Sequence, residues 1–233
     1  MTMPAAPLAG PVREAVAVWA AVILGLAAIE VIALAVPFLH GLVGAVAVAA
    51  FLYAPVRYLE KRGQDARDAG WRFDRLRQDL AWSLGTCALV LPLFALGFFL
   101  FTSWLGRLPA PMQAMLAPYA KGGLRFELRV PISLEFAGQV AGNAAVAFAE
   151  EFFYRGYLTL RFQERWSAVR TAVVVAALFA VGHLLEPAPW RLAVFFPALW
   201  FAWLRWRTGT ILGASIAHFL SNVWLLILER STF

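Results

Sequence analysis

The chain has 233 residues and a formal net charge of +6; 62% of its residues are hydrophobic and only 15% are charged. Its mean hydropathy of +0.71 excludes an ordinary soluble domain. The basic residues gather in short stretches between apolar runs, a pattern typical of a membrane protein and not of a nucleic-acid-binding surface. The single cysteine, Cys87, provides neither a disulfide framework nor a cysteine metal site.

Seven apolar runs approach the length of about 20 residues that a helix needs to cross a bilayer. The first run is too long for the core of a signal peptide, so we expect it to be retained. The sequence therefore predicts an all-α fold, a polytopic transmembrane bundle of about seven helices. The predicted spans are residues 15–38, 41–58, 80–104, 140–162, 168–185, 192–206 and 209–228.

Two polar segments interrupt the predicted spans. Residues 57–79 are rich in Arg and Asp and are predicted to form a basic loop that contacts anionic lipid. Residues 106–133, with several Pro and Gly, are predicted to form an outer loop. We expect N-terminal transmembrane helices over residues 1–133 and a second helix bundle, which carries the chemistry, over residues 134–233.

The distribution of Lys and Arg predicts the orientation in the membrane, because these residues resist translocation. With seven spans and a cytoplasmic N-terminus, most of the 20 basic residues lie on the cytoplasmic side. Arg greatly outnumbers Lys and Ala is abundant, as in GC-rich bacterial genomes. We expect a multi-pass protein of a bacterial inner membrane.

The fourth predicted span contains two acids and a base in the run AEEFFYRGYL. An ionisable residue inside a membrane costs roughly 2.5 to 3.5 kcal/mol on insertion scales, so each one needs a partner or a function. Glu151 and Arg155 share a helix face and can pair. Glu150 points about 100° away and has no local cation. We expect Glu150 to act as a base in a dry site; the alternative is that both glutamates are structural.

Two later spans contain a histidine each. His183 lies in the run ALFAVGHLLEP, after the small Gly182, while His218 and Asn222 share one face of the last span. A lone histidine on an apolar helix is more often a packing residue. An acid, two imidazoles and an amide on three helices together indicate a site.

Peptide hydrolysis needs an activated water and hydrogen-bond donors for the oxyanion that develops on the scissile carbonyl. Glu150 and His183 can hold and deprotonate the water, while His218 and Asn222 can donate to the oxyanion. Alternatively, Glu150, His183 and His218 can bind a zinc ion that activates the water. The residues leave both mechanisms open. Neither a GxSxG nor an HExxH motif is present.

The runs EEFFYR (150–155), FAVGH (179–183) and HFLSN (218–222) resemble, in this order, the motifs EExxxR, FxxxH and HxxxN of the CPBP family. That family contains CAAX prenyl endopeptidases and bacteriocin-processing enzymes, and also the myxosortases. The resemblance covers roughly residues 140–228. It implies a glutamic-type intramembrane endopeptidase that cleaves a membrane-anchored or lipid-modified protein and needs no cofactor, with zinc as the alternative.

Carried over by position, the motifs imply a role for each matching residue. Glu150 and His183 would activate the water, and His218 and Asn222 would form the oxyanion hole. Glu151 and Arg155 would be a supporting pair, and Phe179 a packing residue.

Two other classes of function compete with a protease. A transporter or proton relay also uses intramembrane acids and histidines, and Glu30 in the first predicted span favours it. A non-catalytic immunity protein would hold a toxin in the same cavity. For the protease, a cytoplasmic N-terminus places His183 near the outer end of its helix. We therefore expect a site that opens outward and trims anchored C-terminal segments of exported proteins, as in myxosortases.

Overall fold

The computed structural model describes residues 10–116, 127–130, 132–185 and 189–231. All regular secondary structure in these residues is helical, which confirms the predicted all-α bundle. Five helices are long and apolar enough to cross a membrane, so the chain is an integral membrane protein. These candidate spans are Pro11–Ala35, Gly41–Glu60, Leu76–Leu105, Ala168–Leu185 and Leu212–Ser231.

The other two predicted spans are helical but do not have the length and composition of a simple span. The fourth is a continuous helical run from Leu134 to Gln163 that is interrupted by a π-helix over Phe152–Leu158. The sixth corresponds to α8, whose 14 residues extend about 21 Å, less than the bilayer core of about 30 Å. A 3₁₀ segment, Pro189–Val194, precedes α8 and lengthens it.

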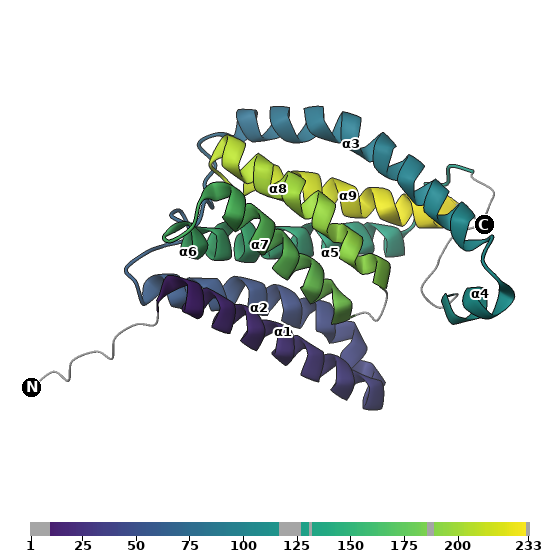
Figure 1. Cartoon of the computed structure of the whole chain (residues 1–233), viewed down its shortest axis with the longest axis horizontal. Helices are drawn as coiled ribbons and strands as arrows, with labels where there is room; N and C mark the ends of the chain where they lie inside the picture. The colour runs from purple at the N-terminus through teal and green to yellow at the C-terminus, as the bar shows by residue number, and fades with distance from the viewer. Residues whose placement is uncertain (1–9, 117–126, 131, 186–188, 232–233) are drawn as a thin grey trace, which may run out of the picture.

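The long helices run antiparallel along one axis of the molecule (Figure 1). In this view α3 lies along one side and α1 and α2 along the opposite side, with α5 to α9 between them. α9 packs against α3, α5 and α8, and α2 packs against α1 and α5. The helices are α1 (Pro11–Ala35), α2 (His40–Glu60), α3 (Leu76–Leu105), α4 (Ala110–Leu116), α5 (Leu134–Glu151), α6 (Thr159–Gln163), α7 (Ala168–Gly182), α8 (Phe195–Thr208) and α9 (Leu212–Ser231).

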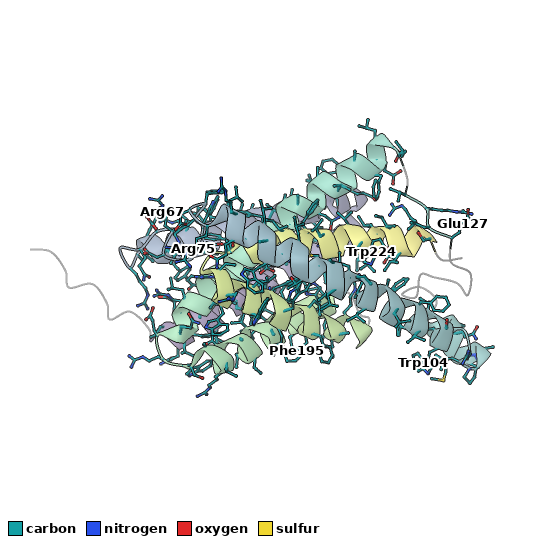
Figure 2. The ribbon with its side chains drawn as sticks, turned by 90° about the horizontal axis from the view of Figure 1, so that it is seen from above. Arg67, Arg75, Trp104, Glu127, Phe195 and Trp224 are labelled. Atoms are coloured by element: carbon teal, nitrogen blue, oxygen red, sulfur yellow. The ribbon has the colours of Figure 1, made fainter. Side chains whose placement is uncertain are left out.

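The two ends of the bundle differ in charge. Figure 2 shows Arg67 and Arg75 at one end and Trp104 and Glu127 at the other. The first end carries the start of α1, the connection from α2 to α3, and the turn from α8 to α9; we call it the arginine-rich end. The predicted basic loop is shorter than expected, because Arg57 lies in α2 and Asp79 in α3. The predicted outer loop contains α4. Residues 117–126 of that loop lie outside the described residues, as do residues 1–9.

Local sequence signals explain the boundaries of the helices near the site. α5 begins at a Ser133 cap, whose side chain accepts a hydrogen bond from the backbone N–H of Phe136. α8 ends at Gly209, whose φ of 76° is a left-handed conformation that glycine adopts without strain. All seven residues of the π-helix are buried, and π-turns of this kind occur frequently at functional sites.

Candidate active site

Glu151 and Arg155 form a fully buried ion pair at the junction of α5 and the π-helix. Arg155 Nη1 lies 2.9 Å from Glu151 Oε1, and both side chains are 0% exposed. Arg155 Nη2 also donates to the carbonyl of Ala198 in α8. Its guanidinium lies over the rings of Phe179 and Phe201, which covers its faces with aromatic carbon. The sequence spacing predicts this pair. Arg155 also contacts Phe179 of α7 and both Ala198 and Phe201 of α8, so the pair is packed between helices.

His218 is held by the same carboxylate. Its Nδ1 lies 2.9 Å from Glu151 Oε1, and its ring stacks on Phe201 with an interplanar angle of 19°. This orientation brings His218 Nε2 to 3.6 Å from Glu150 Oε2. Glu151 therefore serves two cation-forming groups, Arg155 and His218. The sequence predicts only its pairing with Arg155.

His183 lies where α7 gives way to a 3₁₀ turn, and one of its ring nitrogens is already in use. Nδ1 lies 2.9 Å from the backbone carbonyl of Phe179. A carbonyl only accepts hydrogen bonds, so Nδ1 carries a proton and Nε2 of the neutral ring is an acceptor. His183 also lies against the Phe179 ring, with 4.4 Å between the ring centroids. His183 is thus able to hold a water through Nε2.

Gly182 allows close packing beside His183. A Cβ atom at this position would lie 3.0 Å from the hydroxyl of Tyr154 and 3.2 Å from Ile23 Cδ1. The atoms that approach this glycine therefore belong to side chains of the π-helix and α1.

The candidate residues line one cavity of about 470 Å³. Glu150, His183, His218 and Asn222 all contribute to its wall, although they come from three separate parts of the chain. Asn222 makes no hydrogen bond with another described residue, so its amide is available to a ligand. Phe179 lies behind the wall, 2% exposed, and packs against both histidine rings.

Residues 133–224 match the family model of type II CAAX prenyl endopeptidase Rce1-like proteins. Over this segment, about two fifths of the chain, the sequence is similar to the Rce1-like family. The matched segment contains every candidate residue from Glu150 to Asn222, and it leaves α1 to α4 outside. The match supports a CAAX-type intramembrane protease at the level of the family. No curated protein and no solved structure matches it.

Among the residues that the structure describes, no three His, Cys, Asp or Glu side chains are grouped so as to hold a metal ion. Nδ1 of His183 faces a carbonyl and Nδ1 of His218 faces a carboxylate, which leaves Nε2 of each ring available to a ligand. Zinc binding by Glu150, His183 and His218 stays a prediction.

The cavity also has wall residues that the motifs do not include. Asn143 lies two turns before Glu150 on α5, and that seven-residue spacing is the signal that could have identified it. Tyr154 lies one turn after Glu150. Glu30 of α1, assigned from sequence only to a transporter, lines the cavity together with Glu229 near the end of α9. Sequence alone gives no signal for these two acids, because α1 and α9 are far apart in the chain.

Proposed function

We propose that the chain is a glutamic-type intramembrane endopeptidase, which hydrolyses a peptide bond of a membrane-anchored or lipid-modified protein with a water activated by Glu150. One observation carries this proposal: Glu150, His183, His218 and Asn222 line a single cavity inside a membrane protein. The match of residues 133–224 to the Rce1-like family model supports the reaction class. Peptide hydrolysis needs a base near the attacking water and hydrogen-bond donors near the oxygen of the scissile carbonyl.

In this mechanism a water molecule lies between Glu150 and Nε2 of His183. Glu150 takes a proton from the water while the water oxygen attacks the scissile carbonyl carbon, which forms a tetrahedral intermediate with a negatively charged oxygen. The C–N bond then breaks, and Glu150 returns the proton to the leaving amine. The products are a carboxylic acid and an amine, which become a carboxylate and an ammonium when the acid's proton passes to the amine, and the enzyme is regenerated.

The oxyanion is stabilised by His218 and Asn222. Asn222 donates through its amide nitrogen. His218 Nδ1 faces a carboxylate, so that nitrogen carries a proton, and Nε2 donates only when the ring is an imidazolium. In that state the formal charges of Glu150, Glu151, Arg155 and His218, which contact one another, sum to zero. Each oxyanion donor is worth about 2.7 to 4 kcal/mol.

The substrate enters, in this proposal, from the end of the bundle opposite the arginine-rich end. The cavity continues from Glu150 and His218 towards Arg191 and Glu229, which lie near the starts and ends of helices at that opposite end. By the positive-inside rule, the arginine-rich end is cytoplasmic. The substrate would then be an exported protein with a membrane anchor, and the cleaved bond would lie towards the outer face.

The experiment reconstitutes the full chain in proteoliposomes with a panel of single-span proteins and lipid-modified CAAX peptides, and detects products by mass spectrometry. We expect products with wild type and with Glu30→Gln, and none with Glu150→Gln. A transporter or an immunity protein would give no products with any variant. Activity that is lost with a chelator and restored by zinc would replace the glutamic mechanism with the metal-dependent one.

A further inference from the structure

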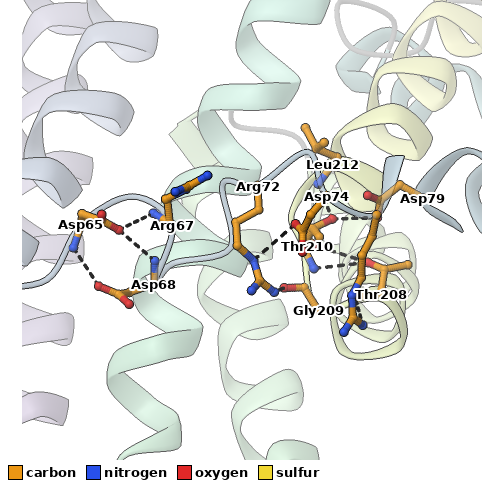
Figure 3. A network of polar contacts seen from close by, with 11 residues as sticks. Asp65, Arg67, Asp68, Arg72, Asp74, Asp79, Thr208, Gly209, Thr210 and Leu212 are labelled. Carbon is orange, nitrogen blue, oxygen red and sulfur yellow. Dashed lines mark hydrogen bonds and ion pairs between the residues drawn. The ribbon is translucent and has the colours of Figure 1, made fainter. Parts of the chain in front are cut away.

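A second cavity lies at the arginine-rich end, far in sequence from the Rce1-like motifs. It is an open hollow of about 840 Å³ in the connection between α2 and α3. We call it the basic hollow. Its lining residues are Ala66, Arg67, Trp71, Arg72, Phe73 and Asp74. Figure 3 shows how this connection lies against the turn between α8 and α9.

Two guanidinium groups converge at the edge of the basic hollow. Arg72 donates to the carbonyl of Gly209 (Figure 3). Arg75 donates to the carbonyl of Thr208. Both groups lie close to the side of Gly209 that has no side chain, at 3.6 and 3.7 Å from the position of a Cβ. Two guanidinium groups that lie next to the same glycine repel each other unless an anion lies nearby. Nε of Arg72 is also buried without a hydrogen-bond partner among the described residues.

The acids of the connection make their hydrogen bonds to groups other than these guanidiniums. Asp65 and Asp68 accept hydrogen bonds from backbone N–H groups of their own loop, and so fix its shape. Asp79 is 0% exposed and accepts from the hydroxyl of Thr210. Asp74 is an exposed partner of Arg72, at 3.8 Å from its Nε. Arg72 and Arg75 thus donate to backbone carbonyls, and Arg67 has no side-chain partner among the described residues.

Apolar side chains flank the basic hollow on the side from which α3 enters the membrane. Phe73 is 63% exposed and Leu76 is 44% exposed, although α3 is an apolar span. Arginines that precede a membrane-crossing helix lie at the depth of lipid headgroups. The planar fork of a guanidinium matches the oxygens of a phosphate group. We infer that the basic hollow binds the phosphate of an anionic phospholipid, with Phe73 and Leu76 against the lipid's apolar part.

Such a lipid would stabilise the turn from which α9 starts. The N–H of Ile211 donates to the carbonyl of Gly70, and Thr210 bonds to Asp79 in α3. α9 continues from this turn to His218. An anion between the guanidiniums removes their mutual repulsion and so holds the connection against the turn. The inference does not depend on proteolysis, because it concerns only binding and stability.

The test uses the purified full chain, stripped of lipid in detergent and titrated with phosphatidylglycerol or with phosphatidylcholine. Bound lipid is counted by native mass spectrometry, and thermal unfolding is followed by tryptophan fluorescence. The variants are Arg67→Gln and Arg72→Gln. The matched control is Arg165→Gln, which removes one exposed arginine after α6 that has no side-chain partner among the described residues.

Wild type and Arg165→Gln are expected to bind phosphatidylglycerol in preference to phosphatidylcholine and to unfold at a higher temperature when it is bound. Each hollow variant is expected to bind it about tenfold more weakly, as expected for the loss of one charge-assisted hydrogen bond. Arg67→Gln removes no contact within the described fold, so its result does not depend on folding. Equal binding by all four proteins would overturn the inference. Stabilisation of wild type by inorganic phosphate at the same concentration would also overturn it, because the ligand would then be a free anion.

Discussion

Replacing Glu151 with glutamine should affect both stability and cleavage, because its carboxylate contacts both Arg155 and His218. The Oε1 atom of Glu151 lies 2.9 Å from Arg155 Nη1 and 2.9 Å from His218 Nδ1. Glutamine has a similar shape but no charge, so Arg155 would remain buried without the counter-ion that Glu151 supplies. Removing one member of a buried ion pair costs about 3 to 5 kcal/mol of stability. Glu150→Gln is the matched control, because Glu150 makes one longer contact, at 3.6 Å; we expect it to cost about 1 kcal/mol.

The assay measures unfolding of both variants in mixed micelles by denaturant titration, and cleavage per folded molecule in proteoliposomes. Glu151→Gln should unfold at clearly lower denaturant than Glu150→Gln. Its folded fraction should also cleave about 10²- to 10³-fold more slowly than wild type, because the His218 imidazolium loses its counter-ion and with it one oxyanion donor.

A double variant distinguishes the loss of charge from the loss of shape. Glu151→Leu combined with Arg155→Met replaces the buried pair with apolar side chains, which is often neutral for stability. It should recover most of the stability that Glu151→Gln loses and none of the cleavage. If Glu151→Gln and Glu150→Gln unfold at the same denaturant concentration, the carboxylate does not hold Arg155 and His218 together, and the reasoning is wrong.

Three further predictions concern single contacts. Asn222→Ala should lower kcat about 10²- to 10³-fold with unchanged thermal unfolding, since its amide bonds to no other described residue; a parallel fall in unfolding temperature would indicate a structural role. Gly182→Ala should cost about 1 to 3 kcal/mol of stability, because its Cβ meets Tyr154 and Ile23, whereas Gly142→Ala, which meets nothing within 4 Å, should cost little. Glu14 accepts hydrogen bonds from Nε and Nη2 of Arg62 and raises the pKa of that guanidinium, so Glu14→Gln should destabilise the protein more than Glu60→Gln, which breaks an exposed pair; equal unfolding temperatures would contradict this.

The helical fold and the grouping of the motifs were predictable from the sequence for a physical reason. A membrane leaves a chain few options, because every backbone polar group in lipid must bond internally. Apolar length therefore locates the helices, and α7 and α9 lie close to their predicted ranges. Acids and histidines are costly in lipid, so the presence of Glu150, His183 and His218 in apolar spans indicates that these side chains lie near one another.

The contact between Glu151 and His218 was not predictable, because it depends on how two helices face each other. Spacing along one helix gives the pair of Glu151 with Arg155, but it contains no information on the rotation of α9 about its own axis. The structure fixes that rotation with Phe201, which stacks on His218, and with Gly213, which lets α9 approach Asp79 and Ser83 of α3.

The shortness of α8 has a related origin. An apolar stretch is read from sequence as one element, yet Pro189 starts a 3₁₀ segment and Gly209 ends the α-helix in a left-handed conformation. Ala198, near the start of α8, supplies the carbonyl that accepts from Arg155 Nη2. The guanidinium is thus shared between Glu151 Oε1 and a carbonyl from a separate helix. The same Oε1 atom faces His218 Nδ1, which leaves Nε2 of that ring directed towards Glu150. The orientation of His218 therefore depends on a contact network that joins α5, the π-helix, α8 and α9.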